Sequence, residues 1–179
     1  MLKLGKDIFM QLPTFPKIGL RTTKTALAVF LCLLLFPSEP FFACMTTIFC
    51  LQDTSSNSRR MAFIRGFGTI FGGAIGLFFV YICRFVKQTI SIAYLGTVCT
   101  YFIIALGIIT VIYLLNLFKR QGCIPIACIV FLAVTTANAY KAPVYYTINR
   151  IVETLFGIVI GLLVNYYVTP PKDFHKSNE

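Results

Sequence analysis

Long apolar runs separated by short polar stretches dominate the sequence. A helix needs about 20 mainly apolar residues to cross the hydrocarbon core of a bilayer. The runs therefore predict an all-α integral membrane protein with six transmembrane helices. They cover approximately residues 18–36, 40–51, 64–83, 94–118, 122–138 and 145–168.

Two of these runs do not fit a single upright helix. The second becomes polar after Leu51, so we expect its helix to continue through Gln52 and Asp53 into solvent, with a re-entrant hairpin as the alternative. Residues 88–118 carry no charge and are too many for one upright span but too few for two spans with a loop. We expect one span over residues 94–118, preceded by a segment at the membrane interface.

The ends of the chain are polar and complete a division into three parts. Residues 1–17 are basic and mildly amphipathic, which is typical of a cytoplasmic segment at the membrane surface. The transmembrane domain covers residues 18–171, because two consecutive prolines stop the last helix, and residues 172–179 form a polar cytoplasmic tail. The first apolar run is not followed by a small-residue cleavage site, so we expect it to be retained as the first span.

A short sequence pattern occurs twice, over residues 65–77 and 150–162. Two apolar segments share Ile, Leu and Phe easily by chance, but they share Arg, Thr and two glycines in register much less easily. We therefore infer an internal repeat. The matches pair Arg65 with Arg150, Thr69 with Thr154, Gly72 with Gly157, and Gly76 with Gly161.

The two copies lie in the third and sixth predicted spans, which run in opposite directions because three spans separate equivalent points. The repeat is therefore inverted. The fold that we predict is six transmembrane helices as two inverted three-helix repeats, roughly residues 18–84 and 90–168. Arg65 then lies at the inner end of its span and Arg150 at the outer end of its own. Such repeats are typical of transporters, whose substrate path lies near the repeat interface.

Within each copy the matched positions recur at i, i+4, i+7 and i+11, so they share one face of a helix. Two interpretations of this face are open, and both can hold. The glycines allow two membrane helices to approach closely, in which case the third and sixth spans cross there. Alternatively, the arginine ends of the stripes line a water-filled path. The predicted packing glycines are Gly68, Gly72, Gly76, Gly157 and Gly161.

The composition excludes several classes of protein. Hydrophobic residues make up 58% of the chain and the mean hydropathy is +0.82, which does not fit a soluble domain. The net charge is +10, but the basic residues flank uncharged runs, so we expect a positive-inside signal and no binding to nucleic acid. With both termini cytoplasmic, twelve basic residues lie inside (Lys3, Lys6, Lys17, Arg21, Lys24, Arg59, Arg60, Arg65, Lys119, Arg120, Lys172 and Lys176) and four outside (Arg84, Lys87, Lys141 and Arg150).

Four basic residues at or near membrane depth, with neighbouring polar groups, form the predicted substrate pathway. Arg150 is the best candidate for an anion contact, because it lies on the outer side, where topology does not require a cation, and a guanidinium binds a carboxylate through two hydrogen bonds. Glu153 either neutralises Arg150 as an i,i+3 partner or acts as a proton-coupling acid. The predicted pathway residues are Arg21, Lys24, Arg65, Arg150, Glu153, Thr69 and Thr154.

No combination of residues that would form an enzyme active site is evident, so we expect no enzymatic activity, no cofactor and no metal site. The one histidine, His175, lies in the tail, and the sequence lacks a Gly-rich phosphate-binding loop that ends in Gly-Lys-Ser or Gly-Lys-Thr. The seven cysteines lie in or beside apolar runs without a Cys-x-x-Cys pair, which is typical of free thiols within a membrane.

Several motifs together resemble a known family. They are similar in order and spacing to the bacterial aromatic acid exporter family, which belongs with fusaric-acid-resistance-type transporters and, more distantly, with plant aluminium-activated malate channels. The resemblance covers about residues 18–171 and implies a six-span membrane domain, organic-anion efflux and dimers. Many relatives carry a cytoplasmic helical domain after the spans, whereas this sequence reads to Glu179. The motifs are Ile18-Gly-Leu-Arg-Thr-Thr-Lys-Thr-Ala-Leu-Ala, Pro40-Phe-Phe-Ala, Arg65-x-x-Gly-Thr-x-x-Gly-x-x-x-Gly and Arg150-x-x-x-Thr-x-x-Gly-x-x-x-Gly-Leu-Leu-Val-Asn165.

The leading hypothesis is therefore a transporter or channel for small organic anions, in particular aromatic carboxylates. It would work in efflux across the inner or plasma membrane. The alternative is a non-transporting multi-pass membrane scaffold or accessory subunit. Because six short spans enclose little interior, we expect a homodimer or a higher homo-oligomer in the lipid bilayer.

Overall fold

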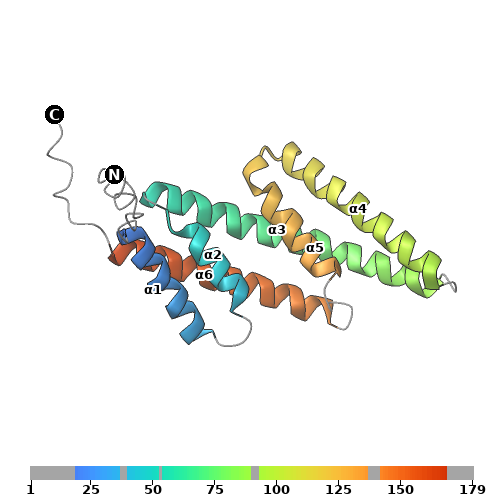
Figure 1. Ribbon diagram of the computed structural model, residues 1–179. Helices are drawn as coiled ribbons and strands as arrows, with labels where there is room; N and C mark the ends of the chain where they lie inside the picture. The colour runs from blue at the N-terminus through green and yellow to red at the C-terminus, as the bar shows by residue number, and fades with distance from the viewer. Residues whose placement is uncertain (1–18, 37–39, 53, 90–92, 137–141, 169–179) are drawn as a thin grey trace, which may run out of the picture.

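The computed structural model describes residues 19–36, 40–52, 54–89, 93–136 and 142–168. Over these residues all regular secondary structure is helical, which confirms the all-α prediction (Figure 1). The elements are α1 (Leu20–Leu35), α2 (Phe41–Cys50), α3 (Ser55–Thr89), α4 (Ala93–Leu117), the short 3-10 helix η1 (Gln121–Cys123), α5 (Ile124–Thr136) and α6 (Pro143–Tyr167).

Three of these helices are long and apolar enough to cross a membrane, which makes the chain a multi-pass membrane protein. They are α3 with 35 residues, α4 with 24 residues over Tyr94–Leu117, and α6 with 25 residues. The apolar helices α2, with 10 residues, and α5, with 13, are shorter than the roughly 20 residues of a full span. The described residues thus contain six α-helices, which is the number of predicted spans. Only three of the six are long enough for a full crossing.

The prediction that the second helix continues through Gln52 was wrong, because α2 ends at Cys50. The polar run that follows interacts with backbone groups around the start of α3 instead of prolonging α2. Ser58 Oγ accepts a hydrogen bond from the Gln52 backbone N–H at 3.2 Å, and Thr54 Oγ1 accepts one from the Asn57 N–H at 3.3 Å. Serine and threonine are favoured at the start of a helix because their hydroxyl oxygens accept hydrogen bonds from backbone N–H groups.

α3 is longer than the predicted third span at both ends. It includes the serine-rich segment from Ser55 and continues past Arg84 and Lys87 to Thr89. At 1.5 Å per residue its 35 residues make about 52 Å, against a hydrocarbon core of about 30 Å. α3 therefore extends beyond the hydrocarbon core.

The last three helices lie close to their predicted positions. α4 and α6 begin and end within two residues of the predicted spans. Pro125 lies in the first turn of α5, where its missing N–H leaves no hydrogen bond unmade. Four predicted features lie outside the described residues: the segments 1–17 and 172–179, Asp53 and Asn138. The predicted lead-in before α4 begins within α3, which continues to Thr89, and its residues 90–92 also lie outside the described residues.

The turn after α4 closes through an unusual backbone conformation. Lys119 has φ 55°, in the left-handed region that favours glycine. Its N–H bonds to the Asn116 carbonyl and the Arg120 N–H bonds to the Leu115 carbonyl, each at 2.9 Å. These two hydrogen bonds satisfy the last carbonyls of the helix, as in a Schellman-type ending.

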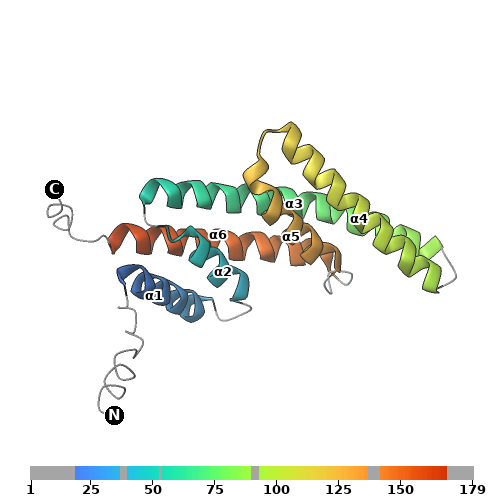
Figure 2. The same ribbon diagram turned by 45° about the horizontal axis from the view of Figure 1, so that its top comes forward.

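The two long helices α3 and α6 run side by side in opposite directions (Figures 1 and 2). α1 and α2 pack on α6, whereas α4 and α5 pack on α3, with the short helices α2 and α5 making the more extensive contacts. Each group has its own apolar core. Phe131 and Leu115 are fully buried in one, and Cys32 and Ala43 in the other. Between these cores lies the boundary of α2, α3 and α6, where the buried polar groups gather.

Candidate functional site

Polar residues that share a face of α3 or of α6 are buried inside the bundle. Successive members lie three, four or seven residues apart, except that Glu153 and Thr154 are adjacent, and none has more than 6% of its surface exposed. In a helix bundle surrounded by lipid, polar side chains are expected to face inward in this way. We call this set the polar seam; it consists of Ser58, Arg65 and Thr69 on α3 and Thr147, Arg150, Glu153 and Thr154 on α6.

Arg150 has its charge neutralised within its own helix. Its Nη1 donates a hydrogen bond to Glu153 Oε2 at 2.9 Å, and Asn149 Nδ2 donates one to Glu153 Oε1 at 2.7 Å. The Arg150 guanidinium carbon also lies 4.0 Å from the ring centre of Phe42 and 4.8 Å from that of Tyr146. Because Glu153 is fully buried and its two oxygens each accept a hydrogen bond, the geometry is that of an i,i+3 neutralising partner.

Arg65, which matches Arg150 in the repeat, lies in a different electrostatic environment. Its guanidinium carbon stacks 4.0 Å from the ring centre of Phe49. The residue that matches Glu153 is Gly68, which has no side chain to neutralise the charge of Arg65. Over the described residues, the Arg65 guanidinium forms no ion pair or hydrogen bond, and its Nε is buried without a partner. A buried charge without a counter-ion is a costly state.

The two arginines stack on opposite ends of α2. Phe42 lies in the first turn of this helix and Phe49 in the last. Seven residues of helix correspond to about 10 Å. The short helix α2 thus holds the two guanidinium groups apart along the seam.

The glycines of the repeat pack against the short helices, not against each other. A Cβ on Gly72 would collide with the carbonyl oxygen of Ala127 in α5, and one on Gly157 with that of Ala43 in α2. The prediction that α3 and α6 cross at these glycines was therefore wrong about the partner helices. The three other predicted glycines are also closely packed: Cβ atoms would lie 3.1 Å from Ile126 at Gly68, 3.1 Å from Val134 at Gly76 and 3.0 Å from Cys50 at Gly161.

The close approach of α3 to α6 occurs at a glycine that the sequence analysis did not select. A Cβ on Gly73 would lie 2.9 Å from Thr147 Cγ2 on α6. The Gly-Gly pair in α3 could have indicated this contact, because two adjacent glycines lower the stability of a helix and therefore suggest a packing role. The repeat alignment obscured it, because the position that matches Gly73 is Ile158.

Thr47 is a further polar group that the sequence analysis missed. Its Oγ1 donates a hydrogen bond to the Gly157 carbonyl at 2.8 Å, and Cys32 Sγ lies 3.1 Å from the same hydroxyl. Thr47 is fully buried, so these contacts link α1, α2 and α6. The sequence feature that could have indicated it is the pair of adjacent threonines within a short apolar run, where a polar side chain needs a buried hydrogen-bond partner.

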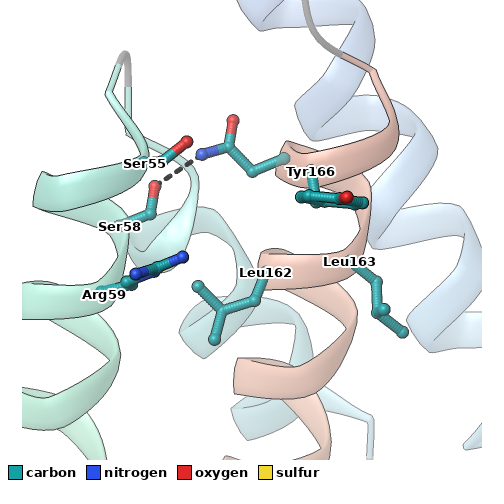
Figure 3. A pocket seen from close by; sticks show the side chains of 7 residues that line it. Ser55, Ser58, Arg59, Leu162, Leu163 and Tyr166 are labelled. Carbon is teal, nitrogen blue, oxygen red and sulfur yellow. Dashed lines mark hydrogen bonds between the residues drawn. The ribbon is translucent and has the colours of Figure 1, made fainter.

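A cavity of about 290 Å³ lies at one end of the polar seam, between the start of α3 and the end of α6 (Figure 3). The hydrogen bond drawn there joins Asn165 Nδ2, the donor, to Ser58 Oγ at 2.8 Å. Arg65 follows Ser58 by seven residues, about 10 Å deeper along α3. The cavity is lined by Ser55, Ser58, Arg59, Leu162, Leu163, Asn165 and Tyr166.

The other predicted pathway residues divide into buried and exposed groups. Thr69 and Thr154 are buried in the seam, one turn beyond Arg65 and Arg150. Arg21 is exposed and Lys24 half-buried near the start of α1. Neither of these two cations is buried to the degree of the two seam arginines.

Two further predictions concern metal ligands and cysteines in the described residues. Within them, no group of three or more His, Cys, Asp or Glu side chains could hold a metal ion. All seven cysteines are free thiols, as predicted.

Comparisons with known proteins show what the chain is similar to. The chain is similar to UPF0421 proteins of Staphylococcus epidermidis (29% identical over 168 residues, 90% of this chain and 46% of the relative), Staphylococcus haemolyticus (30% over 166 residues, 89% and 45%) and Halalkalibacterium halodurans (29% over 161 residues, 88% and 41%). The chain thus spans less than half the length of these relatives. No solved structure matches it.

A family model described as aromatic acid exporter family member 1 matches residues 16–168. The match includes every helix that contributes to the polar seam. The chain belongs to the aromatic acid exporter family.

Proposed function

We propose that this chain is a transporter or channel for small aromatic carboxylate anions, working in efflux, and that Arg65 is the residue that contacts the anion. The observation that carries the proposal is the Arg65 environment. A guanidinium with 6% exposure stacks on Phe49 and has no counter-ion among the described residues. A carboxylate would supply the missing charge through two hydrogen bonds.

Arg65 replaces Arg150 as our candidate for this contact. Glu153 already occupies the guanidinium of Arg150 at 2.9 Å, so an incoming anion would meet a neutral pair. At Arg65 the anion meets an uncompensated cation in a site with low water access, where the attraction is stronger than in bulk water. We assign Arg150 and Glu153 a structural role at the other end of the seam.

The cavity between α3 and α6 is a suitable entrance to this site. It combines the exposed cation Arg59 with the apolar side chains of Leu162 and Leu163 and the ring of Tyr166, a mixture that fits an aromatic acid (Figure 3). From there the buried hydroxyl of Ser58 and then the guanidinium of Arg65 follow along one face of α3.

We also propose that the domain is built from two inverted repeats. Support comes from matched contacts, since Gly72 packs on Ala127 of α5 just as Gly157 packs on Ala43 of α2. Ala43 and Ala127 differ by 84 positions and the two glycines by 85, so nearly the same offset relates the helices and their partners. We further propose both termini in the cytoplasm and a homodimer or higher homo-oligomer, which cross-linking in native membranes would detect.

Flux measurements on proteoliposomes test the function. The full chain is reconstituted and the movement of radiolabelled benzoate is followed, with wild type expected to show saturable flux. Arg65→Gln should lower the flux at least about tenfold, since a hydrogen bond to a charged group contributes about 1.5–3 kcal/mol. Arg65→Lys should be intermediate, because a point charge replaces a planar fork.

The matched control is Arg84→Gln, which removes one cation from the same helix outside the polar seam and should leave the flux within about twofold. Normal flux in Arg65→Gln would show that the anion path lies elsewhere. Absence of flux in the wild type, together with a co-purifying larger partner, would favour the scaffold or accessory subunit instead.

A further inference from the structure

Three basic side chains gather at a second, separate site, where the turn between α4 and α5 lies over α3 (Figure 1). A cavity of about 180 Å³ lies between Arg60 of α3 and the consecutive residues Lys119 and Arg120 of the turn. This cation pocket is lined by Arg60, Phe63, Ile64, Lys119, Arg120, Gln121, Gly122 and Cys123. Neither the polar seam nor the proposed anion path uses any of these residues.

The charge of the cation pocket is not balanced by the described part of the protein. None of its three basic side chains forms an ion pair or a hydrogen bond with another described residue. The contact that holds Arg120 is the ring of Phe63, whose centre lies 4.8 Å from the guanidinium carbon. A pocket with this charge and size fits a phosphate group.

The backbone at Lys119 is a second, independent observation. A lysine in the left-handed conformation is less favourable than a glycine at the same position, and this residue has φ 55°. The Schellman-type ending of α4 holds this conformation and places Lys119 and Arg120 together at the edge of the pocket.

An aromatic ladder leads from the pocket along α3. The rings of Phe63 and Phe67 stack at 5.8 Å between centres, those of Phe67 and Phe71 at 5.9 Å, and Phe118 meets Phe71 edge-on at 6.0 Å. The first and last of these four side chains are exposed, and the two between are half-buried. The ladder covers eight residues of helix, about 12 Å, which is a suitable track for an acyl chain.

We propose that the cation pocket binds the phosphate of an anionic phospholipid, with an acyl chain lying along the ladder formed by Phe63, Phe67, Phe71 and Phe118. Basic pockets between membrane helices bind such headgroups through charge, and the apolar track holds the lipid tail. A soluble phosphate anion shares the headgroup chemistry but cannot use the ladder. The proposal is independent of the anion path through Arg65.

Stabilisation of the purified full chain against heat, in an uncharged detergent, tests this site. Dioleoyl phosphatidylglycerol is titrated against dioleoyl phosphatidylcholine, glycerol 3-phosphate and inorganic phosphate, and the fraction of folded protein after heating is measured by size-exclusion chromatography. Phosphatidylglycerol should raise the midpoint temperature, and the other three additives should do so much less. Arg60→Gln, Lys119→Gly and Arg120→Gln should each weaken the phosphatidylglycerol effect about fivefold in concentration, as expected for one cation near a membrane surface.

Arg84→Gln is the matched control, because it removes a cation of the same helix that does not line the pocket, and it should leave the titration unchanged. Lys119→Gly also separates folding from binding, since it relieves the left-handed strain and should fold at least as well as wild type. Equal protection by inorganic phosphate or glycerol 3-phosphate would assign the pocket to a soluble phosphate compound and overturn the lipid. An unchanged preference for phosphatidylglycerol in the three pocket variants would overturn the site itself.

Discussion

At the residue scale, Arg65 and Arg150 occupy matched positions but differ in what balances their charge. Sequence reasoning favoured Arg150 because it lies on the side where basic residues are sparse. The structure places the buried Glu153 carboxylate 2.9 Å from Arg150 and leaves Arg65 with the ring of Phe49. The two substitutions to glutamine should therefore differ in their effects on stability.

Arg150→Gln should destabilise the fold by about 3–5 kcal/mol, because it leaves the carboxylate of Glu153 buried without its cation. The double variant Arg150→Met/Glu153→Leu removes both charges and should recover most of the loss. Equilibrium unfolding in sodium dodecyl sulfate measures both. If the single variant is as stable as wild type, the pair is not the stabilising contact that its geometry implies.

Arg65→Gln should leave the free energy of unfolding unchanged or raise it, because it removes a buried charge that has no counter-ion in the described residues. Loss of flux with retained or increased stability is the signature of a residue kept for function. The same unfolding assay provides the measurement, with Arg84→Gln as the reference for removing a cation from α3. A large loss of stability in Arg65→Gln would instead indicate a structural contact.

At the element scale, the two glycine stripes hold a short helix against a long one. Gly72→Ala and Gly157→Ala should each destabilise by about 1–3 kcal/mol, because the added methyl group would meet a backbone carbonyl that cannot rotate away. Gly66→Ala is the control on α3, since its Cβ would lie 3.5 Å from the nearest atom, an ordinary contact. Thermal unfolding of the three variants separates the two effects, because all three raise helix propensity but only Gly72→Ala and Gly157→Ala disturb the packing. Equal stability of Gly72→Ala and Gly66→Ala would contradict the α3–α5 contact.

The elements also show how far the sequence could predict the structure. The long apolar runs defined α4 and α6 to within two residues, because hydropathy and helix punctuation agree there. They misplaced the end of α2, because a polar run after Gln52 is compatible with a helix that continues into solvent and equally with the start of a new helix. In the structure the hydroxyls of Thr54 and Ser58 accept backbone hydrogen bonds around the start of α3.

The sequence pattern selected five of the seven residues of the polar seam, all but Ser58 and Thr147, but not the partners of those residues. Helical periodicity placed the two arginines on buried faces, yet only tertiary packing decides which helix a glycine touches. It likewise decides whether an arginine meets an acid or an aromatic ring. Gly73 and Thr47 were missed because each acts through contacts with helices distant in sequence.

At the scale of the whole molecule, the antiparallel arrangement of α3 and α6 constrains the topology. Ser56 lies in the first turn of α3, and Ala142 directly precedes α6 (Figures 1 and 2). If both helices cross the bilayer, these positions must face opposite sides, whichever way the protein is inserted. The excess of Lys and Arg near Ser56 supports our proposal that this end lies in the cytoplasm.

Single cysteines at Ser56→Cys and Ala142→Cys test this arrangement in a background where the native cysteines are replaced by alanine or serine. A membrane-impermeant maleimide added to intact cells should label Ala142→Cys, and it should label Ser56→Cys only after the membrane is opened. Labelling of both from the same side would contradict two antiparallel crossings, and with them the proposed inverted repeat. Labelling of Ser56→Cys alone from outside would keep the crossings but reverse the insertion. It would then place the entrance cavity beside Ser58 outside the cell, which is incompatible with entry of an exported anion from the cytoplasm.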